Sequence, residues 1–278
     1  MNKLNFALAA LLSSTPAAHA AAEGVAPIVV KLAGREGGEL LGAWDGQRWV
    51  SLPAAVPLVK ADTPYRLQSL SGDSSSAVGS SPVSFEVPCP DAFSVDFKPN
   101  PPSKQSLIAT RPDLRTRPRP VTLLPTNNPA YQAIMRTELR KRGLSVPALK
   151  LQRLVRVDLD GDGRSEVILE ASLFSNSPGL FPAPNAAAGD YSLLLLRSVI
   201  SGKVQTTVLG EDVMLKAGNP DTPRLNTQFR LEGVADLNGD GQMELLTSDS
   251  YYEGESLYVW TWTPGRGLKK VLETGCGV

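Results

Sequence analysis

Histidine is absent from the sequence after residue 20, and this removes several classes of site at once. The one histidine, His19, lies in an apolar leader that we expect to be cleaved. A chain without histidine cannot build a Ser-His-Asp triad or a histidine-ligated zinc site. No glycine-rich phosphate loop is visible either. We therefore do not expect an enzyme. Paired carboxylates alone can hydrolyse glycosides, so a carboxylate-based glycan-processing enzyme stays an alternative.

Long apolar runs are also absent. The leader contains Lys3, an apolar run at 6–12 and the small-residue site Ala18-His19-Ala20. This order is typical of a signal peptide, here residues 1–20. No segment approaches the roughly 20 apolar residues that cross a bilayer. The sequence predicts an exported protein, periplasmic or secreted, without a membrane span.

Cysteine is scarce, with only Cys89 and Cys276 in the chain. Export to an oxidising compartment favours a disulfide between them. The alternative is two unpaired buried thiols.

An excess of charge of either sign is missing from the chain as a whole, which has 28 basic and 28 acidic residues. This balance excludes a globally basic nucleic-acid binder. Locally the charge is uneven: residues 96–156 carry 13 basic and 3 acidic side chains, and residues 157–278 carry 9 and 17. The basic segment could face an acidic polysaccharide or lipid head groups. A solvated face or pairing with the acidic C-terminal part is the interpretation we favour.

The remaining pattern predicts an all-β fold with one short helix, of propeller-like or irregular architecture. We expect an N-terminal β region at 21–95, a proline- and arginine-rich connection with one helix at 96–149, and a β region at 150–278. Residues 21–278 can also form one domain. Asp45-Gly46 predicts a hairpin, and the serine-rich segment 71–81 predicts a surface loop. The helix should start at an Asn128 cap and end at Gly143.

One acidic motif occurs twice, 78 residues apart. Counting its first aspartate as position one, oxygen-bearing side chains stand at positions one, three, five and nine, and position seven can offer its backbone carbonyl. Oxygen ligands in this number suit Ca²⁺, and water completes the shell. The expected ligands of the two calcium sites are Asp158, Asp160, Asp162, Arg164 and Glu166 in the first loop, and Asp236, Asn238, Asp240, Gln242 and Glu244 in the second.

The glycines at position six, Gly163 and Gly241, should adopt the positive φ that a tight turn requires. The first loop brings four carboxylates together and the second brings three, so we expect the first to bind calcium more tightly. Treating the loops as separate, we expect Asp160→Ala and Asp240→Ala to have additive effects.

Strand-like runs on both sides of each loop, and an acid at position nine, distinguish the motif from the EF-hand. The EF-hand needs a glutamate at position twelve, where this chain has Leu169 and Thr247. The motif resembles the FG-GAP or VCBS repeat of integrin α-type propellers and secreted bacterial proteins, over residues 153–171 and 231–264. The resemblance implies calcium at the positions above and packing of four-stranded units. The 78-residue interval could be two blades or one blade with an insertion at 175–189.

Aromatic residues are few, and three of them, Tyr258, Trp260 and Trp262, share one strand face. They could stack on sugar rings, but packing between sheets is the expected role. Tyr251 and Tyr252 could line a binding rim or form an ordinary turn. The function that we expect is a calcium-binding interaction module for a protein or glycan at the cell envelope or outside the cell. A purely structural envelope protein is a further alternative. The sequence does not indicate an oligomeric state.

Overall fold

The structure, a computed structural model, describes residues 24–102, 104–145, 148–175, 182, 184–218 and 223–278. The predicted signal peptide lies outside the described residues, as do residues 176–181 and 183 of the segment 175–189. The described part of the chain forms three antiparallel sheets, two α-helices and one short 3-10 helix. The predicted all-β class is confirmed.

The N-terminal sheet has nine strands and curls into a half-barrel. Its order is β6-β7-β2-β1-β9-β4-β5-β8, with β3 paired to β2. Its concave side buries aromatic and branched side chains, among them Tyr65, Leu67 and Phe97. The strands are β1 (Ala26–Lys31), β2 (Gly38–Trp44), β3 (Trp49–Ser51), β4 (Thr63–Ser69), β5 (Ser74–Gly79), β6 (Val83–Ser84), β7 (Phe93–Val95), β8 (Phe97–Lys98) and β9 (Leu107–Thr110).

The C-terminal half forms two sheets, each built around a four-stranded meander. One meander is β11-β12-β13-β14, extended by β10, and the other is β15-β16-β17-β18. One acidic loop belongs to each meander, so the 78-residue interval is one four-stranded unit with an insertion. The strands are β10 (Thr122–Leu123), β11 (Leu151–Val157), β12 (Glu166–Leu173), β13 (Tyr191–Ile200), β14 (Lys203–Val213), β15 (Gln228–Ala235), β16 (Glu244–Tyr251), β17 (Gly254–Thr263) and β18 (Gly267–Gly277).

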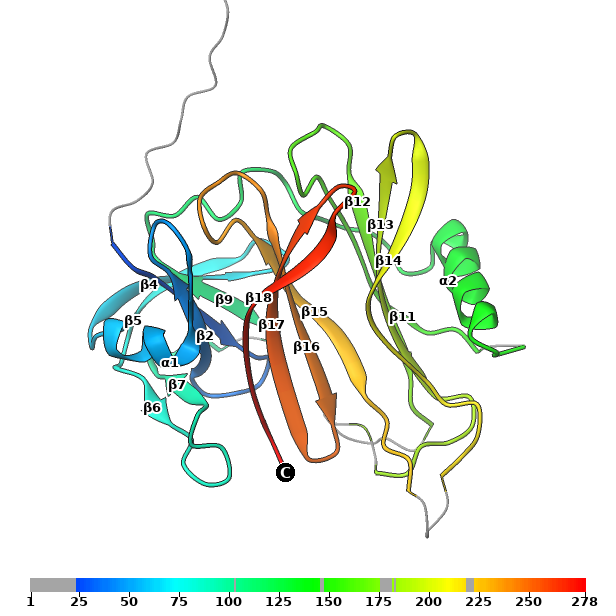
Figure 1. Cartoon of the computed structure of the whole chain (residues 1–278), viewed down its shortest axis with the longest axis horizontal. Coiled ribbons are helices and arrows are strands. Elements are labelled where there is room, and N and C mark those ends of the chain that lie inside the picture. The colour runs from blue at the N-terminus through cyan, green and yellow to red at the C-terminus, as the bar shows by residue number, and fades with distance from the viewer. Residues whose placement is uncertain (1–23, 103, 146–147, 176–181, 183, 219–222) are drawn as a thin grey trace, which may run out of the picture.

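The sheet β15–β18 lies between the other two, as Figure 1 shows. Its one face packs on the five-stranded sheet, where Val155, Leu196 and Leu245 belong to one buried cluster. Its other face packs on the N-terminal sheet, and Ile108 of β9 enters the same cluster as Leu246. The approach there is close: a Cβ at Gly233 would lie 2.2 Å from Ile108 Cδ1. The N-terminal sheet and the C-terminal half of the chain therefore share a continuous core.

Helix α2 (Pro129–Lys141) covers the outer face of the five-stranded sheet. Asn128 caps it by accepting a hydrogen bond from Ala130 N at 3.0 Å, and Gly143 follows it with a φ of +99°. Both ends agree with the prediction. A second helix, α1 (Leu52–Ala55), and the 3-10 helix η1 (Val56–Leu58) were not predicted. They are too short to leave a periodic pattern.

The predicted loop at 71–81 is wrong, because β5 occupies most of it and pairs with β4. Ser74, Ser76 and Val78 are exposed while Ala77 and Gly79 are buried, an alternation that small residues conceal in the sequence.

Candidate metal centre

The two acidic loops join the first two strands of each meander. In both loops the side chains accept the same set of hydrogen bonds from backbone N–H groups. The side chain at position one accepts from the N–H groups of positions four and six. The side chains at positions three, five and nine accept from the N–H groups of positions five, seven and two, respectively. In the first loop the acceptors are Asp158 (Gly161 N 2.7 Å, Gly163 N 3.1 Å), Asp160 (Asp162 N 3.2 Å), Asp162 (Arg164 N 2.7 Å) and Glu166 (Leu159 N 2.9 Å). In the second they are Asp236 (Gly239 N 2.7 Å, Gly241 N 2.9 Å), Asn238 (Asp240 N 3.0 Å), Asp240 (Gln242 N 2.7 Å) and Glu244 (Leu237 N 2.8 Å).

Glycine allows this curl. Gly163 and Gly241 have φ of +83° and +87°, as predicted, and the glycines at position four are also left-handed. The leucine at position two, Leu159 or Leu237, is buried and attaches each loop to the core. The two copies of the motif therefore share one backbone design.

The glutamates at position nine of the two loops are buried, which disfavours their charged form. Glu166 and Glu244 are 3% and 1% exposed, and no ion pair reaches either among the described residues. Burial, followed by the charges of Asp160 and Asp158, raises the pKa of Glu166 to about 7. Burial and the nearby aspartates raise the pKa of Glu244 well above its usual value, and burial also raises that of Asp236. A cation would relieve each of these carboxyls.

The first loop fits the geometry of one calcium shell. Single oxygen atoms of Asp158, Asp160 and Glu166 all lie within 4.8 Å of one another. Oxygens bound to one Ca²⁺ at about 2.3–2.6 Å lie no more than about 5 Å apart, so these three suit one ion. Among the described residues, Asp162 does not belong to this group, and the acids of the second loop form no such group. The side chains of Arg164 and Gln242 are exposed.

The two loops contact each other, which the sequence did not predict. Met243 N donates a hydrogen bond of 2.9 Å to Leu159 O, which joins position eight of the second loop to position two of the first. The premise that the loops are separate, on which additivity was expected, is therefore wrong.

The basic connection also contacts both loops. Arg119 donates to Asp158 O at 2.6 Å and to Leu159 O at 2.8 Å, and Thr116 O accepts from Asp236 N at 2.8 Å. Elsewhere in the basic segment, ion pairs join Arg142 to Glu211 and Arg153 to Glu170. Among the described residues, three of the 13 basic side chains of this segment, Arg119, Arg142 and Arg153, thus form ion pairs with the acidic C-terminal part. No sequence signal indicated that Arg119 reaches the loop.

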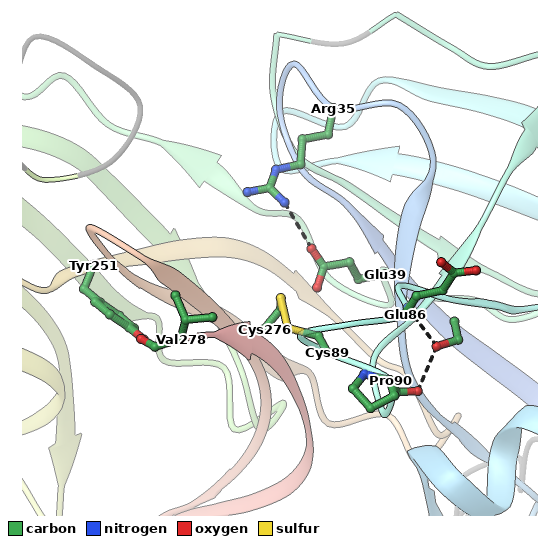
Figure 2. The surroundings of a disulfide bond; sticks show 9 residues. Arg35, Glu39, Glu86, Cys89, Pro90, Tyr251, Cys276 and Val278 are labelled. Carbon is green, nitrogen blue, oxygen red and sulfur yellow. Dashed lines mark hydrogen bonds and ion pairs between the residues drawn. A yellow bond between two sulfur atoms is a disulfide. The ribbon is translucent and has the colours of Figure 1, made fainter.

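At the other end of the molecule, Cys89 and Cys276 form the predicted disulfide, with Cα atoms 5.4 Å apart. It links the loop between β6 and β7 to β18. Figure 2 shows Arg35 and Glu39 beside this bond, and Tyr251 with Val278 on the far side of it.

The aromatic strand face is engaged inside the protein. Trp262 is 5% exposed in the core between two sheets. Trp260 Nε1 donates to Thr247 Oγ1 at 2.8 Å, and the Tyr258 hydroxyl donates to Asp249 at 2.7 Å. Packing, the expected role, describes these residues better than a sugar platform.

Neither helix among the described residues is long and apolar enough to cross a membrane. Comparisons of the chain with protein-family models, with curated proteins and with solved structures found no match.

Proposed function

We propose that the chain is an exported calcium-binding β protein of the FG-GAP or VCBS type, in which two ions brace a binding module. The observation that carries the proposal is the repeated loop. Its two copies, 78 residues apart, have one hydrogen-bond pattern, and each buries a glutamate that no ion pair from the described part of the chain neutralises. The ligand types are those that Ca²⁺ prefers.

Calcium at these loops would brace the place where several parts of the chain meet. The loops contact each other, and the connection lies against both through Thr116 and Arg119. An ion that holds the carboxylates of one loop would therefore stabilise two sheets and the segment between them. We assign the ions this bracing role rather than a catalytic one.

Thermal unfolding tests the proposal. The protein is unfolded in excess chelator and then across a calcium series, with magnesium as the control ion. One site at 100 times its dissociation constant should add about 2.7 kcal/mol, which shifts the melting temperature by several degrees. Asp160→Ala should abolish the contribution of the first loop and Asp240→Ala that of the second, whereas exposed Asp91→Ala should behave like the wild type. An unchanged calcium response in both loop variants would refute the ligand assignment.

The binding role has its own test. Retention of the protein by envelope glycans or by one envelope protein supports the proposed role. Release of product from a glycan, abolished by replacing one acid outside both loops, would support the carboxylate-based enzyme instead.

A further inference from the structure

A recess of about 500 Å³ opens beside the disulfide, at the end of the molecule away from the two acidic loops. Its walls come from three parts of the chain, up to 220 residues apart: the turn before β2, the loop between β6 and β7, and the start of β17. We call it the glutamate pocket. Its charged and aromatic lining residues are Arg35, Glu39, Phe85, Tyr252, Glu253 and Glu255.

The disulfide holds two of these walls together. Cys276 is the cross-strand partner of Glu255 in the β17–β18 ladder, and Cys89 follows Phe85 on the opposite wall. Both cysteines line the pocket. The disulfide therefore joins the strand pair that carries Glu255 to the loop that carries Phe85.

Two glutamates at the base of the pocket share one arginine. Arg35 donates from Nη1 to Glu39 at 3.5 Å and from Nη2 to Glu255. The side chains of Glu39 and Glu255 are 10% and 13% exposed. The bond to Glu39 is at the limit of hydrogen-bond length, and it is the one side-chain bond that Glu39 makes among the described residues.

Negative charge is in excess around this base. Three glutamates (Glu39, Glu232, Glu255) and two arginines (Arg35, Arg230) interact electrostatically there. The pocket lining itself holds three glutamates, Glu39, Glu253 and Glu255, against one arginine, Arg35. Burial raises the pKa of Glu255 to about 7; Arg35 and Arg230 oppose this, and Glu39 and Glu232 add to it. Burial also raises the pKa of Glu39. Glu39 and Glu255 thus share the positive charge of a single arginine of the lining, Arg35.

The rim is apolar and accessible. Tyr252 is 49% exposed and Phe85 is 36% exposed, and Pro88 lies beside them. An aromatic rim above a carboxylate base suits a positive group on a hydrocarbon stem, because the stem covers the rings while the charge reaches the acids.

We propose that the glutamate pocket binds an organic cation, an ammonium or guanidinium group on an apolar stem, with its charge against the two buried glutamates and its stem against the aromatic rim. A neutral sugar would form hydrogen bonds but leave the surplus charge in place, and an anion would add to it. This ligand class deepens the binding role proposed above, and it does not require the calcium loops to be filled.

The test is a calorimetric or NMR titration of the protein with pentylguanidine and pentylamine, and with 1-pentanol as the neutral molecule of the same length. We expect the two cations to bind with dissociation constants on the order of millimolar and pentanol at least tenfold more weakly. A capped pentapeptide with one central lysine distinguishes a side chain of a protein partner from a free amine.

Glu255→Gln and Glu39→Gln should each weaken binding of pentylguanidine at least tenfold. Glu86→Gln, an exposed acid near the pocket but outside its lining, should change the affinity less than twofold. Tyr252→Ala removes an exposed ring, leaves the core intact and should weaken binding severalfold, so it tests the rim if a glutamate variant folds poorly. Equal binding of pentanol and the cations, or unchanged affinity in both glutamate variants, would overturn the proposal.

Titrations in calcium and in chelator separate this proposal from the previous one. Binding of pentylguanidine in a protein that shows no calcium-dependent melting shift would refute the calcium sites alone. A calcium shift without cation binding would refute the pocket alone.

Discussion

Glu166→Gln should change the stability of the protein in opposite directions with and without calcium. In the absence of an ion, Glu166 is a buried carboxylate among other acids, and its pKa rises from the usual 4.5 to about 7. The folded state then binds more protons than the unfolded state between these two values. The free energy of unfolding therefore has its full value below pH 4.5 with respect to Glu166. It falls as the pH rises toward 7 and stays at its lower level above that pH.

The magnitude follows from the pKa. A rise from 4.5 to about 7 corresponds to an unfavourable contribution of about 3 kcal/mol once the carboxyl is ionised. Water and local relaxation reduce this, so at pH 8 in chelator we expect the glutamine variant to be about 1–2 kcal/mol more stable than the wild type. Its side-chain oxygen can still accept the bond from Leu159 N. At pH 5 the gain should largely vanish, because the wild-type side chain is then mostly protonated.

Excess calcium should reverse the order. The wild type gains the binding free energy of the ion, about 2.7 kcal/mol at 100 times the dissociation constant, and the variant loses a charged ligand and most of that gain. Urea unfolding at pH 5 and pH 8, each in chelator and in calcium, measures all four values. Glu273→Gln, an exposed acid, is the matched control. A variant less stable than the wild type in chelator at pH 8 would show that the environment of Glu166 does not oppose its ionisation.

Three further outcomes follow from the structure. The disulfide closes a separation of 187 residues, so reducing it, or replacing both cysteines by serine, should destabilise the protein by up to about 5 kcal/mol in urea unfolding; an unchanged midpoint would contradict this. Arg119→Ala removes two hydrogen-bond donors from backbone carbonyls of the first loop and should lower the free energy of unfolding by about 2–3 kcal/mol. Arg119→Lys should recover part of this loss in the same unfolding curves. Equal stability of all three proteins would show that these bonds contribute nothing. Asp160→Ala and Asp240→Ala should be non-additive by about 0.5 kcal/mol or more in calcium, because Met243 N and Leu159 O join the loops; a double-mutant cycle that closes within error would leave the loops independent.

Strong local patterns made much of the C-terminal half predictable. The long strands have clear alternation or continuous apolar runs, and α2 has a cap, a proline and a terminal glycine at the expected positions. The N-terminal sheet was harder to predict. Strands such as β7 and β8 have two or three residues, and five of the six residues of β5 are serine, alanine or glycine, so their pairing depends on neighbours far away in the chain.

The same division applies to the sites. The acidic loops are local in sequence, and their hydrogen bonds join residues at most seven positions apart, so the motif alone predicted them. The contact between the loops, the position of Arg119 and the glutamate pocket depend on how the three sheets pack. Arg35 and Glu255 are 220 positions apart, and neither belongs to a motif. Only tertiary structure brings such residues together.

The length of strand β16 sets the distance between the second acidic loop and the glutamate pocket. The strand begins at Glu244 in the second acidic loop and ends at Tyr251, one residue before the rim of the glutamate pocket. Antiparallel ladders to β15 and β17 flank it on both sides. Seven steps along a strand span roughly 23 Å. A paramagnetic lanthanide placed in that loop would therefore report the position of a molecule in the pocket from a known, fixed origin.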